Sequence, residues 1–242
     1  MTYHLTKAGR NACLALVFAS CAMPAQADLS IAMTYLRQEV EAPPVLSNLD
    51  PIPEDRGVAG AEVALADTRT TGQFLGHDYQ LEVVSVPPGG DLAGAAKAAL
   101  AQSCILLIDA PTVDVLTVAD LPEAQGALLF NVSSGARTLR DAECRANLLH
   151  TVAEDAMRTD ALMQVLAARR WTRTVMIIGP RDEDRAFAET LRASALKYGV
   201  EILAEKDWTF ETDLRRSTGA EIPLFTQDFP DHDVLLIADE TD

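Results

Sequence analysis

The chain has 242 residues, of which 48 % are apolar and 23 % are charged, a composition that is ordinary for a soluble globular protein. Its 20 basic and 36 acidic residues give a formal net charge of −16. A negative field of this size repels nucleic acid and anionic membrane surfaces, so neither is expected as a partner. The length fits one large domain or two small ones.

The first 27 residues have the three parts of a secretory signal peptide. Lys7 and Arg10 give a positive start, and the apolar stretch 12–23 is too short to span a bilayer. Residues 25–27, Ala-Gln-Ala, form a small-x-small cleavage site before Asp28. Removing these 27 of the 242 residues leaves 215 and takes the formal charge from −16 to −18. We therefore expect an exported, periplasmic protein with no membrane insertion after cleavage.

A second interpretation of this segment stays open. Residues 18–21, Phe-Ala-Ser-Cys, resemble a lipoprotein box in which Cys21 would be acylated. Phe18 fits the first position of such a box poorly, whereas 25–27 fit an ordinary cleavage site well.

Strand-like and helix-like segments alternate along the mature chain. Short apolar runs predict strands at 30–36, 79–86, 105–109, 127–131, 174–179, 200–204 and 234–238, with a short extended stretch at 148–151. Helical spacing of apolar residues predicts helices at about 55–71, 91–102, 113–123, 154–169 and 183–198. Asp91 is a good N-cap for the second of these helices, and Gly199 follows the last as a C-terminal glycine.

Short strands that alternate with helices of ten or more residues indicate parallel βαβ units with right-handed crossovers. The irregular polar stretch 132–147 divides two such groups. The predicted fold is α/β, with two doubly wound parallel-sheet lobes at 28–150 and 151–242. In the helix 154–169, the spacing predicts that the buried apolar face consists of Met157, Ala161, Leu162, Val165 and Leu166.

The last predicted strand, 234–238, is followed only by Asp239, Glu240, Thr241 and Asp242. No helix follows to cover the sheet, and only three strands are predicted after residue 173. The second lobe is therefore expected to be incomplete in this chain, which ends at a loop where α/β proteins place ligand-binding side chains.

Two cysteines, Cys104 and Cys144, remain in the mature chain. In an oxidising compartment they are candidates for a disulfide. The alternative is two separate buried thiols, since Cys104 opens an apolar strand and a free cysteine packs as a small hydrophobic residue. The chain has no C-x-x-C motif, so neither thiol–disulfide exchange nor a thiolate zinc site is supported.

Motifs for catalysis and cofactor binding are missing from the sequence. It contains no G-x-S-x-G nucleophile motif, no G-x-x-x-x-G-K-[ST] phosphate loop and no G-x-G-x-x-G after the first predicted strand. His77, His150 and His232 are scattered, with no second ligand at metal spacing. We therefore expect no catalytic residues, no cofactor and no metal, and a protein that is not an enzyme.

Polar loops follow two of the predicted buried strands. Residues 109–114 follow the third strand, and 131–137 follow the fourth. The carboxyl ends of parallel strands meet at the crevice where open α/β sheets bind ligands, so serine, asparagine and backbone N–H groups there can hold a small polar or carboxylated solute. The alternative is that Asn131-Val-Ser-Ser-Gly135 is simply turn chemistry.

These loops belong to segments that resemble a known family. The resemblance is carried by the sequences around 104–111, 129–135, 139–150, 150–164, 184–188 and 234–240, together with Trp171. They are similar to type 1 periplasmic binding proteins, nearest to the Leu/Ile/Val-binding proteins of ABC transporters. More narrowly, they resemble the substrate-binding proteins associated with PQQ-dependent alcohol dehydrogenase systems. The similarity covers nearly all the mature chain but only the front part of a family member.

The resemblance implies a function. Family members close two lobes over a small solute by a hinge motion and then dock on a membrane permease. The loops that would hold the ligand correspond here to Asp109, Ala110, Pro111, Thr112, Asn131, Ser133 and Ser134 in the first lobe and to Asp239 and Glu240 in the second. The sequence Asp109-Ala-Pro111 replaces a hydroxyl-rich loop and would repel a carboxylate, which argues against an α-amino acid ligand. The association with PQQ enzymes does not imply that this chain binds PQQ.

The prediction from the sequence is an exported, monomeric solute-binding protein that delivers a small polar solute to an ABC importer. One alternative is a periplasmic sensor module of the same fold. Another is an exported α/β enzyme, which would need a nucleophile–base pair that the chain does not show.

Overall fold

The computed structural model describes residues 29–40, 53–208 and 225–239. The predicted signal peptide with Cys21, most of the proline-rich loop after the first strand, and Glu240 lie outside the described residues.

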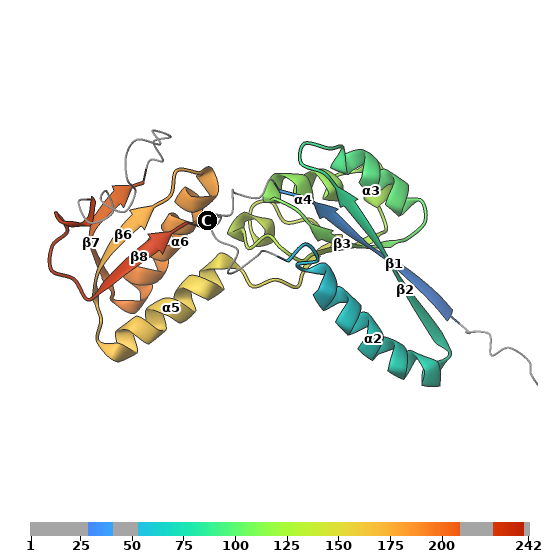
Figure 1. Cartoon of the computed structure of the whole chain (residues 1–242), viewed down its shortest axis with the longest axis horizontal. Coiled ribbons are helices and arrows are strands. Elements are labelled where there is room, and N and C mark those ends of the chain that lie inside the picture. Colours follow the sequence, from blue (N-terminus) through green and yellow to red (C-terminus); the bar gives the residue numbers. More distant parts are fainter. Residues whose placement is uncertain (1–28, 41–52, 209–224, 240–242) are drawn as a thin grey trace, which may run out of the picture.

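Five parallel strands form the first sheet, in the order β2-β1-β3-β4-β5 (Figure 1). The strands are β1 Leu29–Gln38, β2 His77–Val86, β3 Ile105–Asp109, β4 Leu128–Asn131 and β5 Leu148–His150. The segments between them contain the helices α2 Val58–Leu75, α3 Leu92–Leu100 and α4 Thr112–Ala119 and the short 3-10 turns η1 Pro122–Ala124 and η2 Arg137–Arg140. The direction of winding reverses between β1 and β3, as in a doubly wound sheet.

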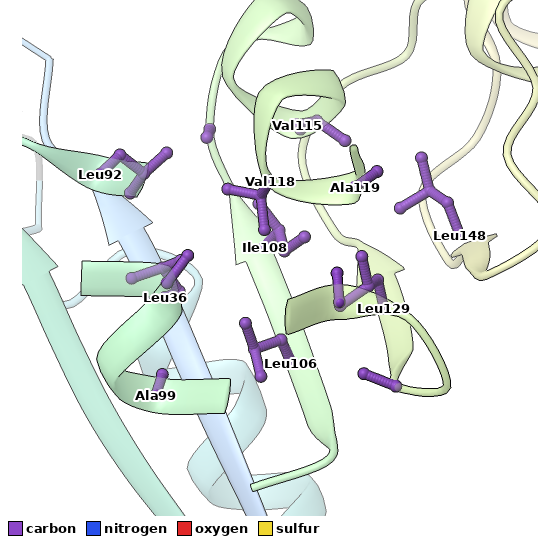
Figure 2. Packing of buried hydrophobic residues seen from close by; sticks show 14 of the residues in the cluster. Leu36, Leu92, Ala99, Leu106, Ile108, Val115, Val118, Ala119, Leu129 and Leu148 are labelled. Carbon is purple, nitrogen blue, oxygen red and sulfur yellow. The ribbon is translucent and has the colours of Figure 1, made fainter. Parts of the chain in front are cut away.

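The first core lies between this sheet and the helices α3 and α4 (Figure 2). Leu36, Leu106, Ile108 and Leu129 from the strands have no exposed surface, and they pack against small or branched side chains of the two helices. Each such burial stabilises the fold by about 1.5–3 kcal/mol. The predicted N-cap of α3 is confirmed, since Asp91 Oδ1 accepts a hydrogen bond of 2.8 Å from the Gly94 N–H.

Helix α2 packs closely on β2. A Cβ atom on Gly72 would lie 2.9 Å from the His77 carbonyl oxygen and 2.9 Å from the Tyr79 ring, so glycine is needed for this approach. The Arg69 side chain donates from Nε to the Tyr79 carbonyl at 2.9 Å, which holds the same turn of α2 to the strand.

Three parallel strands form the second sheet, in the order β7-β6-β8. They are β6 Arg173–Ile178, β7 Glu201–Asp207 and β8 Val234–Ala238, and they are accompanied by α5 Asp155–Arg169 and α6 Asp182–Tyr198. Met176, Ile178, Leu236 and Ala238 face these helices and are buried among their side chains. Gly199 ends α6 in the left-handed conformation with φ 70°, as its position predicts.

The predicted apolar face of α5 is largely wrong. Met157, Leu162 and Val165 are 58 %, 40 % and 54 % exposed, and Ala161 is exposed as well. The buried residues of this helix are Thr159, Met163 and Leu166. The Thr159 hydroxyl lies 2.8 Å from the Ser194 hydroxyl of α6, and Met163 and Leu166 on the same side of the helix join the second core.

Apolar side chains also occupy the sheet faces that point away from these cores. Leu128 and Leu149 of the first sheet are 49 % and 46 % exposed, and Ile237 of β8 is 62 % exposed. The observed fold confirms the predicted α/β class, with parallel sheets and intervening helices.

Candidate functional site

The crevice of a sheet with this strand order lies at the carboxyl ends of β1 and β3, where the winding direction reverses. Three chain segments meet there. They are the end of β1, the loop from Asp109 to Thr112 that joins β3 to α4, and the start of α2 at Gly57.

Asp109 is held by a residue that the sequence did not single out. The Tyr35 hydroxyl of β1 donates a hydrogen bond of 2.8 Å to Asp109 Oδ2. Burial, and then this hydrogen bond, raise the pKa of the tyrosine far above its ordinary value, so the hydroxyl stays protonated and acts as a neutral donor.

Gly57 covers this pair. It precedes α2 with φ 83°, a conformation that favours glycine, and a Cβ atom there would overlap the Tyr35 hydroxyl and lie 3.2 Å from Asp109 Oδ2. The close approach of Gly57 therefore depends on the absence of a side chain. Sequence reasoning could use only the glycine itself as a signal here, because the contact with Tyr35 arises from the fold.

The loops after β3 and β4 are tied together by hydroxyl groups. The Ala110 N–H donates to Ser133 Oγ at 2.9 Å, and Ser133 Oγ donates in turn to the Ala110 carbonyl at 3.2 Å. The hydroxyls of Thr112 and Ser134 lie 2.8 Å apart. Pro111 is the N-cap of α4 and is exposed. The structure thus brings four of the predicted site residues together, with Thr112, Ser133 and Ser134 at least partly open to solvent.

Asn131 has a different place from its neighbours. Its side chain is fully buried. The amide oxygen accepts from the N–H groups of Ser133 and Ser134 at 3.3 and 2.9 Å, and the amide nitrogen donates to the Ser134 carbonyl at 2.7 Å. Asn131 shapes the loop from inside, as the turn-chemistry alternative predicts, and in this conformation it has no exposed surface to offer a solute.

Arg140 and His150 lie near the connection to α5, and the Arg140 charge acts on the His150 imidazole. Arg140 Nη2 donates to the Val152 carbonyl at 2.6 Å, while its Nη1 is buried without a hydrogen-bond partner among the described residues. Burial, and then the nearby Arg140 charge, lower the pKa of His150 from its ordinary value. His150 is therefore held neutral at the end of β5.

In the second sheet, Asp239 follows directly after β8 and is half-buried, while its predicted companion Glu240 lies outside the described residues. The Gly179 N–H donates to the Ala238 carbonyl at 2.8 Å, which joins the ends of β6 and β8. A Cβ atom on Gly179 would overlap the Asp184 carboxylate at the start of α6.

The disulfide prediction is wrong for this structure. Cys104 and Cys144 are free, and both are exposed. The alternative of two buried thiols is also wrong, because Cys104 lies just before β3 rather than within its buried part and Cys144 lies in a turn after η2.

The described residues also line hollows away from this sheet edge. One of about 200 Å³ lies between the starts of α3 and α4, and one of about 270 Å³ lies between α5 and α6 beside Arg137. Over the described ranges, no cluster of three or more histidine, cysteine, aspartate or glutamate side chains is placed to hold a metal ion. No helix within those ranges is long and apolar enough to cross a membrane.

No family model matches the chain, and no curated protein matches it. Solved structures share its fold at low sequence identity. An ABC transporter substrate-binding protein from Desulfitobacterium hafniense in complex with Leu matches with a TM-score of 0.57 at 15 % identity, over 87 % of this chain and 58 % of that one. A periplasmic binding protein from Burkholderia mallei matches with a TM-score of 0.57 at 14 % identity, over 88 % and 54 % of the two chains.

A branched chain amino acid ABC transporter periplasmic ligand-binding protein from Burkholderia xenovorans LB400 matches with a TM-score of 0.59 at 12 % identity, over 81 % and 50 % of the two chains. The fold of the described residues is therefore that of type 1 periplasmic binding proteins. The chain spans about half the length of these structures, between 50 % and 58 %.

Proposed function

We propose that the chain is an exported solute-binding protein that delivers a small polar solute to an ABC importer. The observation that carries this proposal is the shared fold, because each of the three structures above is a transporter-type or periplasmic binding protein. The absence of catalytic motifs from the sequence fits binding without turnover. Fold alone does not specify function, so the argument also depends on the site.

The polar groups at the carboxyl ends of β3 and β4 support a binding function. Ser133 fixes the loop after β3 by two hydrogen bonds to Ala110, and the Thr112 and Ser134 hydroxyls lie beside each other at its rim. One of these two hydroxyls, 2.8 Å apart, donates its hydrogen to the other. The hydroxyl that accepts keeps its own hydrogen, which it can donate to a solute. Such a preorganised rim costs little to order when a ligand binds.

The proposal includes the finer features predicted from the sequence. The lobes are 28–150 and 151–242, and the protein is a periplasmic monomer after signal cleavage. The solute contacts Asp109, Ala110, Pro111, Thr112, Ser133, Ser134, Asp239 and Glu240, while the buried Asn131 shapes the loop that carries Ser133 and Ser134. Its partner is an ABC permease. The solute belongs to a system linked to PQQ-dependent alcohol oxidation.

Binding and export can be tested separately. For export, the chain is expressed with residues 1–27 in a Gram-negative host, and the expected result is a periplasmic protein that begins at Asp28. For binding, the mature chain is screened by thermal shift against amino acids, amino alcohols, polyols and short-chain acids, and hits are measured by calorimetry. We expect one solute per chain, recovered chemically unchanged. Conversion of the solute to a product would contradict the proposal.

A further inference from the structure

Asp109 is a carboxylate with an incomplete set of partners at the point where the sheet reverses its winding. It is half-buried at the end of β3, and one of its oxygens accepts the Tyr35 hydroxyl hydrogen at 2.8 Å. Among the residues that the structure describes, its other oxygen has no hydrogen-bond partner, and no basic side chain forms an ion pair with it. A carboxylate can accept about four hydrogen bonds, so one neutral donor leaves most of its acceptor capacity unused.

The nearest basic residue does not neutralise Asp109. Arg37 and Asp109 are register partners in β1 and β3, so their side chains leave the same face of the sheet. Among the described residues the guanidinium nevertheless forms no ion pair with Asp109, and Arg37 Nη1 donates instead to the Glu54 carbonyl at 2.5 Å in the loop before α2. Arg37 is thereby engaged with the backbone while the carboxylate beside it stays open.

Tyr35 and Gly57 hold the carboxylate in a defined orientation. The tyrosine donates to Oδ2, and a Cβ atom on Gly57 would lie 3.2 Å from the same oxygen, so the start of α2 is close to it. The free oxygen, Oδ1, is therefore the one available to a ligand. A fixed acceptor with a net negative charge selects a donor that carries a positive charge.

We infer that Asp109 is an ammonium-binding subsite and that the solute is a small amine rather than a simple carboxylate. The Thr112 and Ser134 hydroxyls at the same sheet edge provide a donor for an uncharged oxygen, so an amino alcohol matches the site. This inference rests on the proposed function and names the solute class. In this inference Asp109 binds a positively charged group of the solute, whereas a carboxylate-binding loop holds a negatively charged one.

The test uses three probes that share one carbon skeleton. Leucinol carries an ammonium and a hydroxyl, 4-methylpentanoate carries only a carboxylate, and leucine carries both charges. Each is titrated calorimetrically into the mature chain and into Asp109→Asn. The amide keeps an acceptor for the Tyr35 hydroxyl but removes the charge. Asp114→Asn, which removes a carboxylate from the first turn of α4, is the matched control.

We expect saturable binding of leucinol, with an affinity that falls about tenfold or more in Asp109→Asn and stays within about twofold in Asp114→Asn. Without ligand, Asp109→Asn should melt no lower than the wild-type chain, because no ion pair is lost. A lower melting temperature would mean that Asp109 pairs with Arg37 in solution, and would overturn the inference. Binding of 4-methylpentanoate in preference to leucinol would overturn it too, while leaving the proposed function in place. If none of the three probes binds and the solute screen finds no ligand, the result would contradict both this inference and the proposed function.

Discussion

The amide nitrogen of Asn131 lies 3.2 Å from Nδ1 of His150, and these two residues end adjacent strands of the first sheet. The other contacts of the asparagine fix which way its amide points, because its oxygen accepts two backbone N–H groups and its nitrogen donates to a carbonyl. The nitrogen therefore faces His150, so Nδ1 of the imidazole accepts and the proton sits on Nε2.

This relationship predicts how stability depends on pH. The pKa of His150 is lower in the folded protein than in the unfolded chain, where it is ordinary, so the unfolded chain takes up the proton first as the pH falls. The contribution of His150 is fully present above about pH 6.5 and is lost as the pH falls through the folded pKa. Urea unfolding between pH 5 and 8 should show this decline, and His150→Gln should remove it. An equal decline in the variant would assign the effect to other groups.

Replacing Asn131 with alanine should cost about 3 kcal/mol of unfolding free energy. The change empties a fully buried position and leaves backbone groups of Ser133 and Ser134 without their amide partner. Chemical denaturation measures this cost. Gln125→Ala, at an exposed residue after η1, is the control and should change stability by less than about 0.5 kcal/mol. Similar values for the two variants would show that the buried network contributes little.

Gly57 and Gly60 form a matched pair at the start of α2. Gly57→Ala should destabilise the chain by about 2 kcal/mol, since it combines an unfavourable φ with a Cβ that overlaps the Tyr35 hydroxyl. A Cβ atom on Gly60 would meet no atom within 4 Å, and this residue lies in the helix, so Gly60→Ala should stabilise the chain by about 0.5–1 kcal/mol. Thermal melts of both variants measure these changes. A change in melting temperature in the same direction for both variants would contradict the described geometry.

The two cysteines should react as free thiols. Native mature protein treated with iodoacetamide in the absence of reductant should gain two alkyl groups, at Cys104 and Cys144, because both residues are exposed. Peptide mapping identifies the sites. Alkylation only after reduction would support the predicted disulfide between Cys104 and Cys144 and would contradict the structure.

The order of elements could be predicted from the sequence because it depends on local patterns. The apolar run 105–109 is a buried strand, and Asp91 and Gly199 end their helices as their chemistry predicts. The orientation of α5 could not be predicted in this way, because it depends on the contact with α6 and the second core, where Thr159 meets Ser194 and Met163 and Leu166 are buried.

Within the candidate site, the sequence located the loops but not the groups that hold them. Asp109 was identified from its position after a strand, whereas its donor Tyr35 lies 74 residues away and meets it only through the pairing of β1 with β3. Asn131 was selected for its polar side chain, and the structure buries that side chain completely. Burial of a polar residue depends on the tertiary fold, which local spacing does not contain.

The most direct test of the central claim is small-angle scattering of the mature chain with and without the solute found by the screen, followed by recovery of that solute. We predict a decrease in the radius of gyration at one solute per chain as the lobes close, with the solute recovered unchanged. A radius that does not change at saturation, or a solute that is recovered as a different compound, would contradict the account.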